Sequence, residues 1–171
     1  MDETLQSLST RIRILPPTDC QSNLTCAPPP PVSSSEFDAF ERNSGLKLPP
    51  FLRRVYTEIA DGGFGPAWGI NRLTGDNDLS IAHWDRIVQN AKHDDPDQPW
   101  PENLIRFCEI GCNMYYGVDI TTQFAPVFTV DPTCGSDRHE DWLTKESDSV
   151  VEWLHDWAEK EAPKWIEPNR G

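Results

Sequence analysis

The sequence predicts an α+β fold in which N-terminal and C-terminal helices flank a sheet meander, antiparallel or mixed. Three observations lead to this prediction. Helical patterns occupy both ends of the region 33–165, three short apolar segments follow one another between them at 104–110, 114–120 and 126–130, and the separators of these segments are short. Short separators favour antiparallel neighbours, because a parallel pair needs a long crossover. Helices gathered at the two ends, around contiguous strands, argue against a doubly wound fold.

The chain ends are expected to lie outside this domain. Residues 1–32 are predicted to form an N-terminal extension, and residues 166–171 a short tail. Apolar residues at helical spacing predict a helix over 4–15. The four prolines at 28–31 then impose an extended polyproline segment. That segment is either a stiff linker or a ligand for a proline-binding domain.

Capping signals mark the first two helices of the domain. Ser33 and Glu36 have the spacing of a capping box, with Ser35 as an alternative cap. Gly45 is expected to end this helix, because glycine adopts the left-handed conformation without strain. Pro49-Pro50 then starts a second helix, since proline is tolerated in a first turn.

Glycines and prolines predict where the elements in the rest of the chain begin and end. The Asp61-Gly62-Gly63 turn is expected to end the second helix with a left-handed residue. The segment 64–73 reads as a turn that runs into a strand. A helix is predicted over 81–91, and a closing helix over 147–161, capped by Ser149 or by its own first residue.

The charge of the chain limits its partners. Its 171 residues carry a net charge of −13, with a pI near 4.6. Such a surplus excludes nucleic acid as a natural partner, because phosphate binding needs a basic surface. Acidity either keeps the protein soluble or attracts a basic partner. No apolar stretch is long enough for a membrane span and no signal peptide is visible, so we expect a cytoplasmic protein.

No motif in the sequence assembles a catalytic or metal site. Cys108 and Cys112 are separated by three residues, whereas zinc and thioredoxin-type sites use two, so both thiols are expected to be buried beside a strand. The histidines lack metal-binding spacing; they are His83, His93, His139 and His155. We therefore expect no enzyme, no cofactor and no metal. Carboxylates that meet only in the folded chain leave an unrecognised active site as the lesser alternative.

An ordered set of motifs resembles the SUKH superfamily. It begins with Gly45-Leu46-Lys47-Leu48-Pro49-Pro50, continues through the Ile59-to-Gly65 stretch with its Asp-Gly-Gly turn, and includes Trp100-Pro101, the hairpin 111–119 and the final Trp153-Leu154 helix. This superfamily includes fungal cell-wall regulators and bacterial immunity proteins. The resemblance implies an α+β fold over 33 to about 162, no cofactor, no catalysis and, for bacterial members, neutralisation of a toxin.

Taken with the acidity, this resemblance predicts an immunity protein that binds a basic toxin, such as a nuclease. Acids outnumber bases by seven to two over 76–102 and by eleven to five over 131–171. Tryptophans near these stretches are either aromatic anchors or core residues. The expected contacts are Asp76, Asp78, Asp94, Asp95, Asp97, Trp100, Glu140, Asp141 and Trp142. The alternative is a regulatory or scaffold protein of the same superfamily. The oligomeric state is left open.

Overall fold

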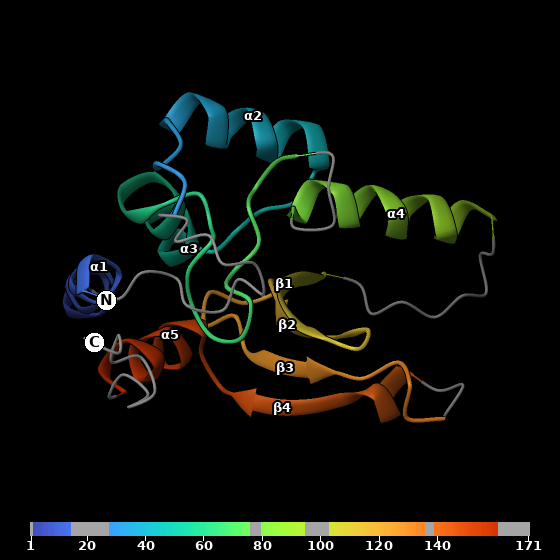
Figure 1. Ribbon diagram of the computed structural model, residues 1–171. Helices are drawn as coiled ribbons and strands as arrows, with labels where there is room; N and C mark the ends of the chain where they lie inside the picture. The colour runs from blue at the N-terminus through green and yellow to red at the C-terminus, as the bar shows by residue number, and fades with distance from the viewer. Residues whose placement is uncertain (1, 15–27, 76–79, 95–102, 136–138, 161–171) are drawn as a thin grey trace, which may run out of the picture.

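The protein folds into an α+β domain, which confirms the expected fold class (Figure 1). The computed structural model describes residues 2–14, 28–75, 80–94, 103–135 and 139–160. The helices are α1 (Asp2–Ile14), α2 (Ser34–Ser44), α3 (Pro50–Arg54), α4 (Ile81–Asp94) and α5 (Val150–Glu159), with a π-helical turn η1 (Val55–Ile59) and a 3-10 turn η2 (His139–Trp142). The strands are β1 (Leu104–Gly111), β2 (Met114–Asp119), β3 (Val127–Val130) and β4 (Leu143–Ser147).

The sheet is an antiparallel meander in the order β1-β2-β3-β4. The turn between β1 and β2 has only Cys112 and Asn113, both with positive φ (53° and 65°). Two left-handed residues in a two-residue loop match the right-handed twist of the strands that they join. This geometry leaves the Cys112 side chain exposed, whereas Cys108 is buried in β1. The expectation that both thiols are buried is therefore wrong for Cys112.

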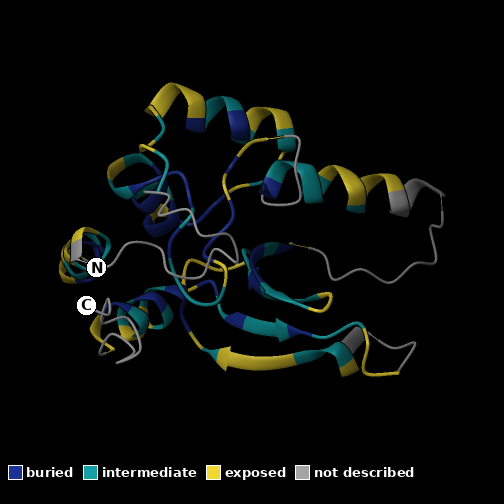
Figure 2. Cartoon of the chain, in the orientation of Figure 1, coloured by how far each residue is buried: buried dark blue, intermediate teal, exposed yellow. Residues whose placement is uncertain are grey.

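The strand content differs from the prediction in two places. The segment 64–73 forms no strand but only isolated bridges, at Ile70 and Arg72. Positive φ values at residues such as Gly65 and Gly69 (116° and 88°) prevent an extended run. A fourth strand, β4, was not predicted and directly follows η2. Its residues are mostly exposed, as Figure 2 shows, so β4 lacks the apolar pattern of a buried strand.

Helix α5 covers one face of the sheet. Val150 and Leu154 are buried, and the ring of Trp153 contacts Phe107 of β1 and Tyr116 of β2 with centroids 6.2 and 5.0 Å apart. Such tilted aromatic contacts add to the stabilisation that burial gives. The helix begins at Val150 rather than at 147, because Ser149 is its cap and the residues before it complete β4.

An arginine ties α4 to the opposite face of the sheet. The guanidinium of Arg106 lies 3.6 Å from the centre of the Trp84 ring on α4 and 4.4 Å from that of Tyr115 on β2. Glu109 of the same strand accepts two hydrogen bonds from it. A nearly buried guanidinium needs this compensation, because an unpaired charge in the interior is costly. Burial also raises the pKa of the Tyr115 hydroxyl.

Helix α1 packs against the domain. Leu5 and Leu8 belong to the main hydrophobic core, with 5% and 0% of their surfaces exposed. The guanidinium of Arg11 lies 5.5 Å from the ring centre of Trp157 on α5. Figure 1 shows α1 and α5 side by side. The boundary expected at residue 32 stays a prediction, but the helix before it contributes to the same core as the domain.

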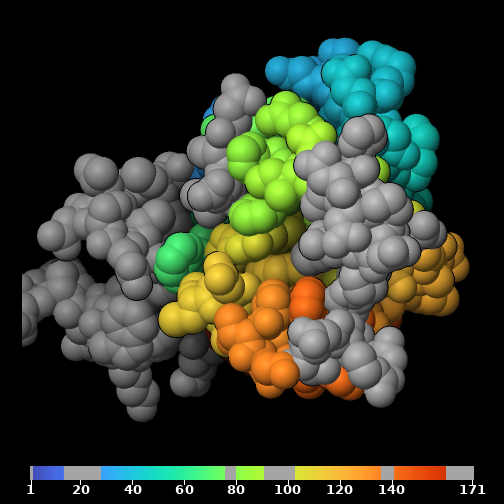
Figure 3. Space-filling model, turned by 90° about the vertical axis from the view of Figure 1, so that its right-hand side faces the viewer, coloured from blue at the N-terminus to red at the C-terminus, as the bar shows by residue number. Residues whose placement is uncertain are grey.

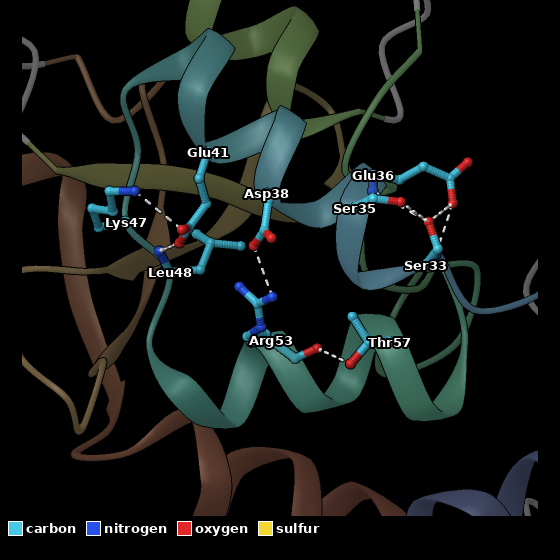
Figure 4. Close-up of polar contacts among 9 residues, drawn as sticks. All are labelled: Ser33, Ser35, Glu36, Asp38, Glu41, Lys47, Leu48, Arg53 and Thr57. Carbon is cyan, nitrogen blue, oxygen red and sulfur yellow. Dashed lines mark hydrogen bonds and ion pairs between the residues drawn. The ribbon is translucent and has the colours of Figure 1, made fainter.

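Local hydrogen bonds hold α2 as the capping signals predicted (Figure 4). The Ser33 hydroxyl accepts a hydrogen bond from the Glu36 amide, while the Glu36 carboxylate accepts from the Ser33 amide at 2.7 Å. The Ser33 hydroxyl also donates to Oε2 of Glu36 at 2.6 Å, and this bond, with a smaller contribution from the Ser33 amide, lowers the pKa of the Glu36 carboxyl. The Glu41 carboxylate accepts from the amide of Leu48, 3.1 Å away, which fixes the chain that leads into α3. Gly45 ends the helix at φ 76°.

The second helix ends differently from the prediction. Its last turn is the π-helical η1, and its cap is Ala60 in an extended conformation, with φ −168°. Gly62 and Gly63 are left-handed, with φ 75° and 74°, but they lie beyond the helix in the turn. There the Gly63 amide donates to the carbonyl of Ile70. Gly62 therefore serves a close approach between backbones and Gly63 lies against the ring of Pro29, so neither glycine forms the helix end.

Candidate binding surfaces

Most of the predicted contact residues lie outside the described part of the chain. These residues are Asp76, Asp78, Asp95, Asp97 and Trp100. Asp94 is the last residue of α4 and Glu140 lies in η2, but the structure does not describe their side chains. The structure thus tests neither their proximity nor their role.

The two predicted contacts that are described differ in environment. Asp141 is exposed. Trp142 is half-buried and packs with Leu143 and Phe128 against a small cluster on the sheet, apart from the main core. Trp142 therefore has a packing role, and a contact with a partner there remains a prediction.

A cleft lies between α2, α4 and residues 72–75; we call it the α2–α4 cleft. Figure 3 shows α2 and α4 next to each other at the surface. The cleft has a volume of about 520 Å³. Its lining residues are Val32, Glu36, Ala39, Phe40, Asn43, Ser44, Asp61, Arg72, Leu73, Thr74, Gly75, Ala82, Asp85 and Arg86. The side chains come from successive turns of α2 and of α4, so both helices present one face to the cleft.

A buried carboxylate organises the floor of this cleft. Asp61 is 3% exposed and accepts hydrogen bonds from the Leu73 amide at 2.9 Å and from Nε of Arg72 at 3.0 Å. Next to it, the buried Tyr56 hydroxyl donates to the carbonyl of Asn71 at 2.7 Å. Burial, with a smaller contribution from Asp61, raises the pKa of this hydroxyl well above its usual value. A buried carboxylate with two donors is satisfied, so the floor is rigid.

The floor is also fixed to α4. The carbonyls of Arg72 and Leu73 accept from the amides of Ile81 and Ala82, at 2.8 and 3.1 Å. The Ser80 hydroxyl accepts from the His83 amide, which caps the helix. Arg72 was not singled out from the sequence, because its partner Asp61 is eleven positions away and no local pattern connects them.

Helix α5 presents an acidic face to solvent, which we call the α5 acidic face. It consists of Glu152, Asp156 and Glu159, all exposed. Their spacing of four and then three residues places them on one side of the helix, opposite the buried Leu154. Within the described part of the chain, no cation pairs with these three carboxylates. The sequence contained this periodicity, but only the structure shows which side is free.

The other candidate reactive side chains, among the described residues, do not come together in one site. Among the described residues, no group of three or more His, Cys, Asp or Glu side chains is arranged to hold a metal ion. Cys112 and Cys134 are exposed thiols at separate turns. A search of the described helices finds none that combines the length and the apolar character of a membrane span.

The sheet, with α5 on one face and α4 tied to the other, defines an α+β domain of the kind that the motifs implied. The model of the SMI1 / KNR4 family (SUKH-1) matches residues 31–156. The chain therefore belongs to this family, and the resemblance to the SUKH superfamily is confirmed. A comparison with curated proteins gave no match.

Proposed function

We propose that this protein is a non-catalytic binding protein of the immunity type, which neutralises a basic toxin by covering part of its surface. Family membership supports the proposal, because the SUKH superfamily includes immunity proteins. A net charge of −13 favours a cationic partner, and opposite charge accelerates the encounter of two proteins. A nuclease is such a partner, since it binds phosphate through basic groups.

The observation that carries this proposal is the α5 acidic face. Glu152 lies in the first turn of α5, where a negative charge is favourable, but Asp156 lies four residues further along the same side and repels it. Glu159 lies in the last turn, which holds no basic residue, and a negative charge is unfavourable at that end of the helix dipole. Asp156 and Glu159 thus do not stabilise α5 in the free protein, and a basic surface that binds them would turn both charges into favourable contacts.

The proposal is tested first with the product of the adjacent gene, if that gene encodes a basic toxin. The full-length protein is titrated against the toxin at low and at high salt, and the toxin's activity is measured in parallel. We expect binding that protects against the toxin and weakens as salt rises, because salt screens exposed charges. Failure to bind, or binding without protection, contradicts the immunity function.

A matched pair of variants then locates the surface. The triple variant Glu152→Gln, Asp156→Asn, Glu159→Gln should lower the association rate constant at low salt by about ten-fold. The control removes three charges from other helical segments, through Glu3→Gln in α1, Asp38→Asn in α2 and Glu58→Gln in η1. Its rate constant should change much less. Equal effects would mean that net charge matters and the α5 acidic face does not.

The regulatory alternative predicts a different result. A regulator would be recovered with a cellular enzyme or assembly in a pull-down, and no toxin gene would lie beside its own. Protection against a neighbouring toxin would exclude this alternative as the main function.

A further inference from the structure

We propose that the α2–α4 cleft binds the C-terminal end of a peptide whose last residue is apolar, and that Arg72 holds its carboxylate. This inference goes beyond the proposed function and does not depend on it, because the cleft and the α5 acidic face share no residue.

Arg72 has the geometry of a group prepared to receive an anion. Its side chain is 49% exposed, while the carboxylate of Asp61 that accepts from its Nε is 4% exposed. The buried partner fixes the direction of the guanidinium and uses only one of its five N–H donors. Within the described residues nothing accepts from the terminal amino groups, Nη1 and Nη2. A carboxylate matches such a pair of parallel donors.

The remaining lining supplies an apolar wall beside this donor pair. The apolar side chains of the lining are those of Phe40 and Leu73, both buried, and of Val32, Ala39 and Ala82. A volume of about 520 Å³ lies within the range of roughly 300–1,000 Å³ that is usual for small-ligand sites. A carboxylate with an adjacent apolar side chain fits both features, and the last residue of a peptide has this chemistry.

The charges and polar groups around the cleft favour a peptide end over a phosphate. The cleft lining holds three acids, Glu36, Asp61 and Asp85, against two arginines, Arg72 and Arg86. With three negative and two positive charges its net charge is −1, so a dianion would meet more repulsion than a single carboxylate. One oxygen of the Glu36 carboxylate, Oε2, accepts from Ser33, which leaves Oε1 as an acceptor for a peptide N–H. Asn43 and Thr74 add polar groups to the lining. The peptide amide that precedes the last residue therefore finds partners.

The test uses the ¹⁵N-labelled full-length protein and a set of small ligands followed by NMR. The ligands are N-acetyl-leucine, N-acetyl-leucinamide, free leucine and inorganic phosphate. We expect N-acetyl-leucine to shift the amide signals of residues 72–75, with a Kd on the order of 1 mM. Loss of the carboxylate in N-acetyl-leucinamide should weaken binding about ten-fold. Free leucine should bind more weakly than N-acetyl-leucine, because its ammonium must lose its strong hydration in the cleft, whereas a peptide amide loses much less.

Three variants separate this site from general effects. Arg72→Lys keeps the charge but loses the paired donors, and should weaken N-acetyl-leucine binding about ten-fold. Ala39→Phe fills the apolar wall without touching the contact between Arg72 and Asp61, and should abolish binding. The control Arg42→Lys changes an exposed arginine of α2 that does not line the cleft, and should leave the affinity unchanged. Thermal unfolding checks that each variant is folded.

Several results would overturn the inference. No shift at 10 mM N-acetyl-leucine, or equal binding of N-acetyl-leucinamide, would remove the role of the carboxylate. Tighter binding of phosphate or of free leucine would assign the cleft to another ligand. Unchanged affinity in both folded cleft variants, Arg72→Lys and Ala39→Phe, would place any binding elsewhere. The variants of the α5 acidic face do not affect these measurements, so each proposal fails independently of the other.

Discussion

Replacement of Gly62 by alanine should destabilise the fold far more than the same change at Gly45. The two glycines have nearly equal φ, 75° and 76°. A Cβ at Gly62 would lie 2.6 Å from the carbonyl oxygen of Ile70 and 2.8 Å from two backbone atoms of Asn71, whereas a Cβ at Gly45 would meet nothing within 4 Å. The pair therefore separates the cost of the left-handed conformation from the cost of the close approach.

The expected magnitudes follow from these distances. The left-handed conformation costs an alanine about 1 kcal/mol, which is the whole effect expected for Gly45→Ala. The clash at Gly62 is with backbone atoms that cannot rotate away, and overpacking of this kind costs about 1–3 kcal/mol more. We therefore expect a loss of about 2–4 kcal/mol for Gly62→Ala.

Urea denaturation of both full-length variants, with the wild-type protein alongside, measures the two free energies of unfolding. Similar losses for Gly62→Ala and Gly45→Ala would refute the reasoning, because the close approach of the turn to residues 70 and 71 would then carry no cost. A change in the slope of the transition would indicate an altered denatured state and is checked in the same data.

Two further predictions concern the N-terminal half. Leu8→Ala should cost about 2–5 kcal/mol in the free energy of unfolding, because Leu8 is fully buried; a loss below about 0.5 kcal/mol would show that α1 is not part of the core. Ser33→Ala should cost about 1 kcal/mol at pH 7, as usual for a helix cap. Because the folded pKa of Glu36 is lowered by Ser33, the stabilisation from this contact is present above the ordinary value of 4.5 and is lost as the pH falls through the lowered pKa. The difference between the urea midpoints of wild type and Ser33→Ala should therefore shrink in acid, to the part that comes from the bond between the Glu36 amide and the Ser33 hydroxyl. A difference that does not change with pH would contradict the role of the Glu36 carboxylate.

The sequence by itself determined the features that depend on neighbouring residues. Ser33 and Glu36 form their capping box because both partners lie within one helical turn. The three predicted strands occur at the expected places, as β1, β2 and β3, because their apolar residues and short separators act locally. The ordered motifs from Gly45 to the final helix identified the family for the same reason: each is a short pattern.

The tertiary structure alone decided the features that depend on distant residues. Strand β4 has no strong pattern of its own, and its place at the sheet edge comes from pairing with β3. Helix α1 joins the core through contacts with α5, near the opposite end of the chain. The α2–α4 cleft exists because Asp61 and Arg72, eleven positions apart, meet beneath two helices. Such contacts form only when distant parts of the chain are brought together on folding. The residues of the cleft and the solvent-facing side of α5 therefore became visible only in the folded protein.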